Sequence, residues 1–166
     1  MVTPRVRRTD IVLVPGFWLN ASAWDAVTPP LVAAGHTVHP LTLPGTASVD
    51  EDRTGITLAD HEAAVVGLTD DLRRQFRERA VPQPGGTVRE PHRLSDDLSR
   101  LDVPTTVVAS EMSADVLRGL MTQGHPYVTE LARHHRYEIV DLPTGHWPMF
   151  TRPVDLGEAI AAAIAR

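Results

Sequence analysis

Four short apolar runs stand out along this chain, each bounded by a proline, a glycine or a polar turn. They are four to seven residues long and rich in β-branched side chains. Runs of this length and composition are typical of buried strands, whereas a helix needs a longer segment with a different period. We therefore predict strands at residues 11–14, 37–43, 105–110 and 137–142.

Apolar residues recur at helical spacing between and after these runs. A helix is expected to begin near Thr28, with two prolines in its first turn, and to end before Gly35. Another begins at Thr57, where the residues resemble a capping box. The other predicted helices lie at 113–121, at 126–133 and from a cap near Thr151 onward, with a loop at 143–150 before the last one.

Strands that alternate with helices predict the α/β class, with β/α units and a mostly parallel sheet. Right-handed crossovers allow the four strands to lie in the order 2-1-3-4, which is a small doubly wound sheet flanked by helices. The chain is long enough for one domain, and we expect a single domain over residues 1–166. Prolines and glycines predict an irregular insert or hinge at about 80–102.

Composition and charge narrow the function classes. The chain has 16 Lys and Arg against 21 Asp and Glu, a net charge of −5, which argues against a nucleic-acid partner. It contains no long apolar run and no secretory leader pattern, so a soluble cytoplasmic protein with no membrane contact is expected. The absence of cysteine excludes disulfides, thiolate metal sites and cysteine nucleophiles. No cofactor motif is present, and no cofactor is expected.

The histidines do not form a pattern that predicts a metal site. His36 and His39 are three positions apart and are expected to point to opposite faces of an extended segment. His134 and His135 are adjacent, and neither pair has a carboxylate or cysteine at the spacing of a metal ligand. We predict no metal.

Candidate chemistry follows three of the predicted strands. The segments are 15–18 after the first strand, 111–115 after the third and 145–148 after the fourth. In α/β enzymes, ligands bind at the carboxyl ends of the strands, so these segments are where a site is expected.

The chain resembles the α/β-hydrolase family, in its serine-esterase-like branch, over residues 10–166. The opening carries the resemblance as V-P-G-x-W followed by Trp24, and the ending carries it in Gly145, His146 and the residues around them. Further similar segments are 34–38, 41–45, 55–60, 141–148 and 150–153.

The resemblance implies roles for several residues. His146 corresponds to the catalytic histidine, and the backbone N–H groups of Phe17 and Trp18 correspond to one half of an oxyanion hole. The catalytic acid would be Glu111 or Asp115, and capping of a helix N-terminus is an alternative role for both. The apolar pocket would be rimmed by Phe17, Trp18, Trp147 and Met149.

One departure from the family pattern changes the expected activity. Family members carry the nucleophile in G-x-S-x-G, and this chain has no such motif. We interpret this as an internal gap near residues 69–76 that removes the central strand, the nucleophile elbow and the helix behind it, so that the chain is a shortened form of the fold.

Three functions therefore remain open. The first is a hydrolase-like protein without ordinary hydrolase activity, in which His146 supports acid/base chemistry on a small apolar carbonyl compound. The second is a non-catalytic binding protein, in which a homodimer completes the sheet. The third is a deletion form of an active carboxylic-ester hydrolase.

Overall fold

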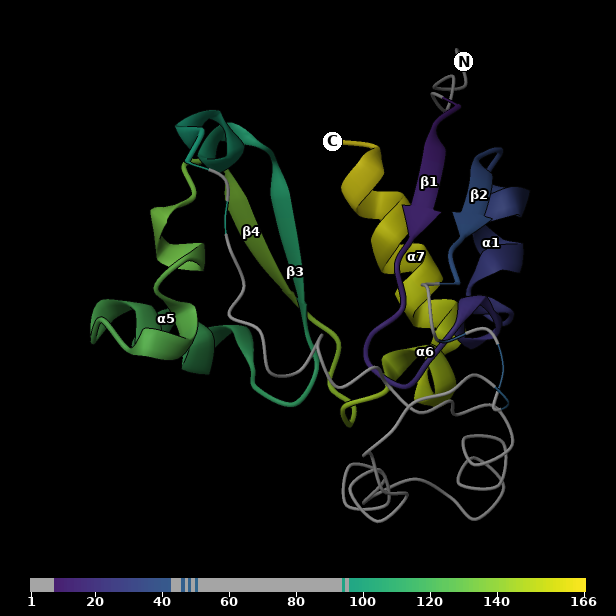
Figure 1. Ribbon diagram of the computed structural model, residues 1–166. Coiled ribbons are helices and arrows are strands. Elements are labelled where there is room, and N and C mark those ends of the chain that lie inside the picture. Colours follow the sequence, from purple (N-terminus) through teal and green to yellow (C-terminus); the bar gives the residue numbers. More distant parts are fainter. Residues whose placement is uncertain (1–7, 43–45, 47, 49, 51–93, 95) are drawn as a thin grey trace, which may run out of the picture. The chain divides into compact units, whose positions relative to one another are not determined.

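The computed structural model describes residues 8–42, 46, 48, 50, 94 and 96–166 (Figure 1). They belong to two compact units. The first unit comprises residues 1–90 and 146–166, and the second comprises residues 91–145. The predicted helix from Thr57, the predicted gap near 69–76 and most of the predicted hinge at 80–102 lie outside the described residues.

The first unit has one short parallel sheet and helices from both ends of the chain. Its described elements are β1 (Asp10–Leu13), the 3₁₀ helix η1 (Ala21–Trp24), α1 (Thr28–Ala33), β2 (Thr37–Pro40), α6 (Pro148–Thr151) and α7 (Pro153–Ile164). In the β1–β2 ladder, Asp10 lies opposite Thr37 and Leu13 lies opposite Pro40. Both strands thus form where they were predicted, although each ends earlier.

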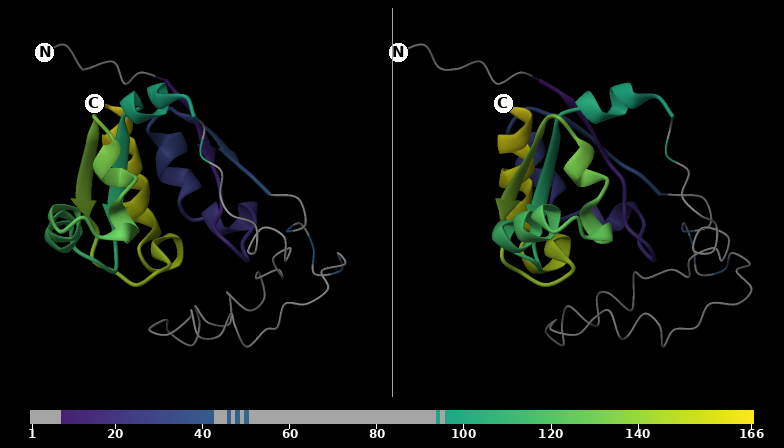
Figure 2. Two further views of the ribbon diagram at one scale, coloured as in Figure 1. Left: turned by 60° about the vertical axis from the view of Figure 1, so that its left-hand side comes forward. Right: turned by 90° about the vertical axis from the view of Figure 1, so that its left-hand side faces the viewer.

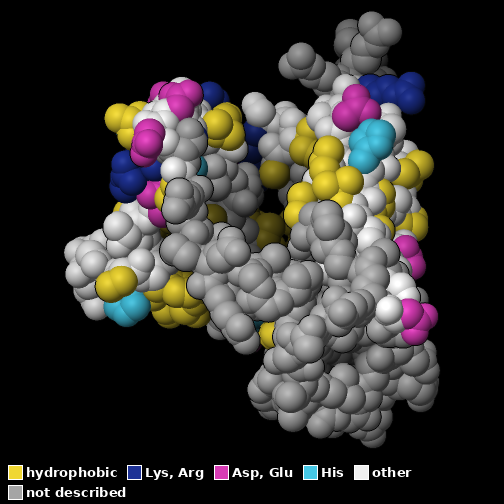
Figure 3. Space-filling model, viewed as in Figure 1, with side chains coloured by type: hydrophobic (Ala, Val, Ile, Leu, Met, Phe, Trp, Pro, Cys, Tyr) yellow, Lys and Arg dark blue, Asp and Glu magenta, His cyan; other side chains and the backbone are white. Residues whose placement is uncertain are grey.

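Burial alternates along β1, which was predicted to be buried on both faces. Ile11 and Leu13 are buried, whereas Val12 is 57% exposed. On the face of the molecule in Figure 3, hydrophobic side chains gather over β1 and β2, beside an acidic and a histidine side chain. The prediction of a fully buried strand was therefore wrong for the described part of the chain, because one face of the strand remains open there.

The helix α1 confirms its sequence prediction closely. Pro29 and Pro30 occupy the first turn, where a missing N–H costs nothing. Val27 and Leu31 are both fully buried. Gly35 follows the end of the helix with a φ of +94°, the left-handed conformation that glycine adopts without strain. α1 packs against α7, which runs beside it in the first unit (Figure 1).

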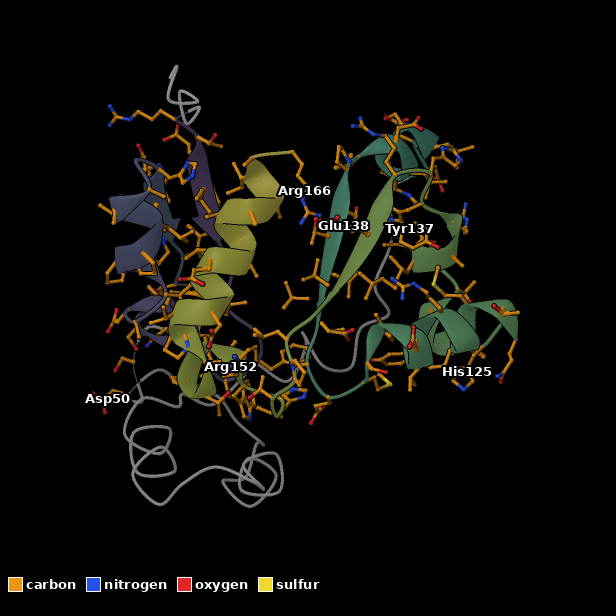
Figure 4. The ribbon with its side chains drawn as sticks, turned by 180° about the vertical axis from the view of Figure 1, so that it is seen from behind. Asp50, His125, Tyr137, Glu138, Arg152 and Arg166 are labelled. Atoms are coloured by element: carbon orange, nitrogen blue, oxygen red, sulfur yellow. The ribbon has the colours of Figure 1, made fainter. Side chains whose placement is uncertain are left out.

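The end of the chain departs from the prediction of a loop to residue 150 and a cap near Thr151. Pro148 begins a single helical turn, α6, and α7 begins only at Pro153. Thr151 does not cap α7, because its hydroxyl donates to the carbonyl of Trp147 at 3.0 Å. Arg152 lies between the two helices, at the start of α7 (Figure 4), and its Nε donates to Asp155 at 2.9 Å.

The second unit has its own parallel pair of strands. Its described elements are the 3₁₀ helix η3 (Leu98–Asp102), β3 (Thr105–Ala109), α5 (Ala114–Thr122), the 3₁₀ helices η4 (Pro126–Val128) and η5 (Leu131–Arg133), and β4 (Tyr137–Asp141). β3 and β4 run side by side in both views of Figure 2, with Thr105 opposite Tyr137 and Ala109 opposite Asp141. Its core consists of Ala109, Ala114, Leu117, Val128 and Ile139.

Helix α5 forms where residues 113–121 predicted it, with Ser113 at its N-cap. The helix predicted at 126–133 is instead the two separate 3₁₀ turns η4 and η5. The irregular segment predicted at 80–102 ends in helical structure, since η3 occupies 98–102.

The structure supports the predicted strand order 2-1-3-4 only for the neighbours 2-1 and 3-4. β1 pairs with β2 and β3 pairs with β4, and the described strands form two separate two-stranded sheets. The observed class is thus α/β with small parallel sheets, and the doubly wound sheet stays a prediction. None of the helices in the described ranges is long and apolar enough to cross a bilayer.

Candidate functional site

A strained turn follows β1. The N–H of Leu19 donates to the carbonyl of Gly16 at 3.4 Å, which closes the turn. Within it, Trp18 has a φ of +68°, and no other non-glycine residue in the described part of the chain has a positive φ. A bulky side chain in this conformation costs about 1–3 kcal/mol, and such strain persists where the surroundings hold it, often at functional sites.

Aromatic packing is one interaction that holds this turn. The rings of Trp18 and Trp147 lie 6.4 Å apart at 55°, and those of Phe17 and Trp18 lie 6.3 Å apart at 48°. Trp147 also forms a buried cluster with Leu19 and Ala23. Trp18, Met149 and Phe150 pack against this cluster. We call these six residues together with Phe17 the aromatic cluster.

A second set of contacts ties the turn after β1 to the segment after β2. Asn20 Oδ1 accepts the N–H of Ser22 at 3.0 Å, and its Nδ2 donates to the carbonyl of Thr46 at 3.4 Å. The hydroxyl oxygen of Thr42 accepts the N–H of Ala21 at 3.3 Å. Sequence reasoning missed Asn20, although an Asn before a short helix is a recognisable N-cap.

His146 lies at the edge of the aromatic cluster. Its imidazole is exposed and meets the ring of Trp147 edge to face, with centroids 4.7 Å apart and an interplanar angle of 79°. Trp147 therefore contacts both the predicted proton carrier and the strained turn. The structure thus brings together Phe17, Trp18, His146, Trp147 and Met149 of the sequence-predicted site.

The members of the cluster differ in their access to solvent. Phe17 is 43% exposed, whereas Trp147 is only 4% exposed. Phe17 therefore presents far more of its ring to solvent than Trp147 does. Trp147 was predicted at the rim of a pocket. Its ring is instead buried against Leu19 and Ala23, where it packs under the turn and faces little solvent.

The two predicted acids lie in the second unit. Glu111 follows β3 and is exposed. Asp115 lies in the first turn of α5, also exposed, where it accepts a hydrogen bond from Arg118 at 3.2 Å. Placement in the first turn of a helix fits the alternative role, in which an acid stabilises the N-terminal end of the helix dipole.

Asp141 is an acid that sequence reasoning missed. Its Oδ1 accepts the N–H of Ala114 at 2.7 Å, at the start of α5. Because β4 pairs in parallel with β3, its carboxyl end lies beside the start of the helix that follows β3. No local pattern in the sequence could have indicated this contact, because the two residues are 27 positions apart.

The clearest pKa shifts in the described residues belong to structural carboxylates outside the predicted site. Partial loss of water raises the pKa of Glu130, but the hydrogen bond and charge of Arg100, with the charge of Arg133, outweigh this and lower it overall. Backbone and side-chain hydrogen bonds from Ser99 lower the pKa of Asp97. The ion pairs of Glu130 with Arg100 and Arg133 link η3 to η5.

The described histidines of the two pairs have separate surroundings. His36 is buried, whereas His39 is exposed and its Nε2 lies 3.0 Å from Asp10 Oδ1. His134 and His135 contact different partners, Thr105 and Asp102. Across the described ranges, no three His, Cys, Asp or Glu side chains form a group that could hold a metal ion.

Of the comparisons with known proteins, the one with solved structures bears on the fold. No protein-family model matches the chain, and no curated protein matches it. A crystal structure of a pyrethroid hydrolase from Sphingobium faniae JZ-2 is similar with a TM-score of 0.61 at 16% identity, over 95% of this chain and 98% of that one. A histidine-to-alanine variant of the pyrethroid hydrolase PytH and PytH with BIF are similar with TM-scores of 0.60 and 0.58, each at 16% identity over 94% of this chain and 97% of theirs. At this identity the likeness shows that the chain has a hydrolase-like α/β fold.

Proposed function

We propose that this protein is an α/β-hydrolase-like protein, descended from serine esterases, that performs acid/base chemistry on a small apolar carbonyl compound. The observation that carries the proposal is the left-handed Trp18, in a turn joined through Trp147 to His146. Backbone strain at a bulky residue costs free energy, and strained residues cluster at functional sites.

The chemistry needs an acceptor for a proton and donors for a developing negative charge. The carbonyl oxygen of the ligand would accept hydrogen bonds from the backbone N–H groups of Phe17 and Trp18. His146 would remove a proton from the carbon beside the carbonyl, and the electron pair of that C–H bond would form an enolate. Return of the proton from the imidazole to the same carbon restores the ligand.

This step avoids acyl transfer, and the sequence supports that restriction. The chain has no G-x-S-x-G motif, so the family's usual nucleophile is missing. Members of a catalytic triad act as a unit, and a histidine without its nucleophile retains proton transfer but loses ordinary ester hydrolysis. The exposed Phe17 and the packed Met149 favour an uncharged ligand.

Hydrogen isotope exchange tests the proposal directly. A ketone such as acetophenone is incubated with the protein in D₂O, and loss of its α-proton signal is followed by NMR. We expect exchange faster than with an equal concentration of free imidazole. His146→Ala should slow it by about 10²-fold or more, since positioned acid/base groups contribute roughly that much.

His39→Ala is the matched control, because His39 is another exposed histidine of the first unit. It should exchange at the wild-type rate. Covalent labelling by a fluorophosphonate, together with His146-dependent turnover of p-nitrophenyl esters, would contradict the proposal and favour an active carboxylic-ester hydrolase.

A second candidate function is association with another copy of the chain. Val12 of β1 and Val14, directly after the strand, are both more than half exposed, which leaves apolar surface open in the described part of the first unit. A second copy could bury this apolar surface and complete the sheet by pairing at a strand edge, without catalysis. Sedimentation velocity tests this: a dimer that dissociates in Val12→Thr supports it, and a monomer at all concentrations contradicts it.

A further inference from the structure

We infer that Trp147 is a positioning residue, which orients the His146 imidazole relative to the strained turn at Trp18. The inference rests on the proposed function and adds a residue whose side chain does not itself meet the ligand. Its basis is that one buried ring contacts both parts of the site.

The ring of Trp147 is itself held firmly. It is 4% exposed and packs with Leu19 and Ala23, which come from the turn and the 3₁₀ helix after β1. Rings buried among close-packed side chains have few alternative rotamers. The His146 ring therefore contacts a side chain whose position is set by the turn and the 3₁₀ helix after β1.

The backbone of Trp147 is also fixed, by its carbonyl oxygen. That oxygen accepts the N–H of Phe150 at 3.0 Å, the N–H of Thr151 at 3.1 Å and the hydroxyl of Thr151 at 3.0 Å. These bonds anchor the start of α6 directly after His146. On the other side of His146, Gly145 is exposed, with nothing within 4 Å of where its β-carbon would stand. The contact of Trp147 with the imidazole is thus backed by a fixed backbone at the start of α6.

Proton transfer depends steeply on such orientation. A displacement of about 1 Å in a catalytic group can lower a rate by about 10²-fold. Loss of the Trp147 ring should therefore reduce the rate of the chemical step, while leaving ligand binding at Phe17 largely unchanged.

The test compares Trp147→Leu with Trp147→Phe. Leucine keeps an apolar residue in the core but offers no ring to the imidazole, whereas phenylalanine keeps an aromatic ring. In the isotope-exchange assay, Trp147→Leu should lower kcat by about 10- to 100-fold with KM within about twofold, and Trp147→Phe should stay within about threefold of wild type.

Leu31→Ala is the control for lost stability, because Leu31 is fully buried in α1 of the same unit and takes no part in the site. It should lower the Tm without changing kcat. If kcat falls in proportion to Tm in all three variants, Trp147 acts only through stability and the inference is overturned.

A spectroscopic measurement reads the orientation without turnover. The imidazole C–H signals of His146, assigned by their absence in His146→Ala, should be displaced by the ring current of Trp147. We expect the displacement to persist in Trp147→Phe and to vanish in Trp147→Leu, with the Leu31→Ala signal at the wild-type position. An unchanged signal in Trp147→Leu would overturn the inference.

The two readouts separate this inference from the proposed function. If the wild-type protein shows no His146-dependent exchange, the proposed function fails, and the NMR signal alone then decides whether Trp147 orients the imidazole. If exchange depends on His146 but Trp147→Leu keeps the wild-type kcat, the proposed function stands and the positioning role fails.

Discussion

Gly157 of α7 lies so close to Pro30 of α1 that a β-carbon at position 157 would stand 2.7 Å from Cγ of the proline. The same β-carbon would lie 3.3 Å from the carbonyl oxygen of Val27. α1 and α7 therefore meet where α7 has no side chain, and Val27 and Leu31 of the α1 segment are fully buried.

The approach predicts that Gly157→Ala destabilises the protein, although alanine is the better helix former. Overpacking of a close contact costs about 1–3 kcal/mol, which exceeds the gain of roughly 1 kcal/mol in helix propensity. Gly119→Ala is the matched control, because Gly119 is also helical and its β-carbon would meet nothing within 4 Å. Urea unfolding should show a loss for the first variant and a gain of about 0.5–1 kcal/mol for the second. Equal shifts in both would contradict the close contact.

The left-handed conformation of Trp18 predicts an unusual order of stability among its variants. Trp18→Ala and Trp18→Gly both remove the ring, but only glycine adopts a φ of +68° without strain. We expect the glycine variant to be more stable than the alanine variant by about 1 kcal/mol. At Ala23, within η1, Ala23→Gly should instead be destabilising. Thermal unfolding of the three variants provides the measurement, and an alanine variant more stable than the glycine variant would refute the strain.

The cap of η3 predicts a local dependence on pH. Asp97 accepts the N–H of Ser99 at 2.9 Å, and this bond lowers the pKa of Asp97 from 3.8. Because the folded pKa lies below the unfolded one, the carboxylate contributes its full stabilisation above pH 3.8 and loses it as the pH falls through the lowered value. Hydrogen exchange at the Ser99 amide should therefore accelerate in acid.

Asp97→Asn separates the cap from the titration, because asparagine caps equally well and carries no charge. We expect exchange at Ser99 to lose its acid-dependent acceleration in this variant, after correction for intrinsic exchange. Asp96→Asn, which removes the neighbouring charge but not the cap, should keep the wild-type dependence. The prediction fails if Asp97→Asn and wild type give the same corrected profile.

The contact between Asp141 and Ala114 predicts a destabilised start of α5 when the carboxylate is removed. Asp141→Ala should cost about 1 kcal/mol, the usual loss for a helix cap, and Asp141→Asn less, because its amide oxygen still accepts. Ser113 caps a different amide, that of Val116, at 3.3 Å. Exchange should therefore accelerate at Ala114 in Asp141→Ala and at Val116 in Ser113→Ala. Acceleration of both amides in either variant would show that the two caps do not act separately.

Local patterns determined the elements that depend on neighbouring residues. The turn residues and prolines that bound β1, α1 and α5 act over a few positions, so Gly35 and Ser113 could be identified as helix boundaries from the sequence. The sequence also predicted that the segments containing Phe17 and His146 each follow a strand, and they do follow β1 and β4.

Two other segments departed from their predicted helices. The helix expected at 126–133 divides into η4 and η5, and Thr151 bonds back to Trp147 and does not begin a helix. At Thr151 the competing hydrogen bond is local, to a carbonyl four positions earlier, whereas Glu130 between η4 and η5 pairs with Arg100 of η3. Helical spacing alone cannot show which of these interactions prevails.

The sequence by itself determined which residue types stand after each strand, because strand and turn propensities are local and strong. Only the tertiary structure decided that Trp147 is buried between Trp18 and His146, and that Asp141 caps α5. The free energies of these contacts come from burial and hydrogen bonding between residues far apart in the chain. Such contacts exist only once the strands have paired and the helices have packed.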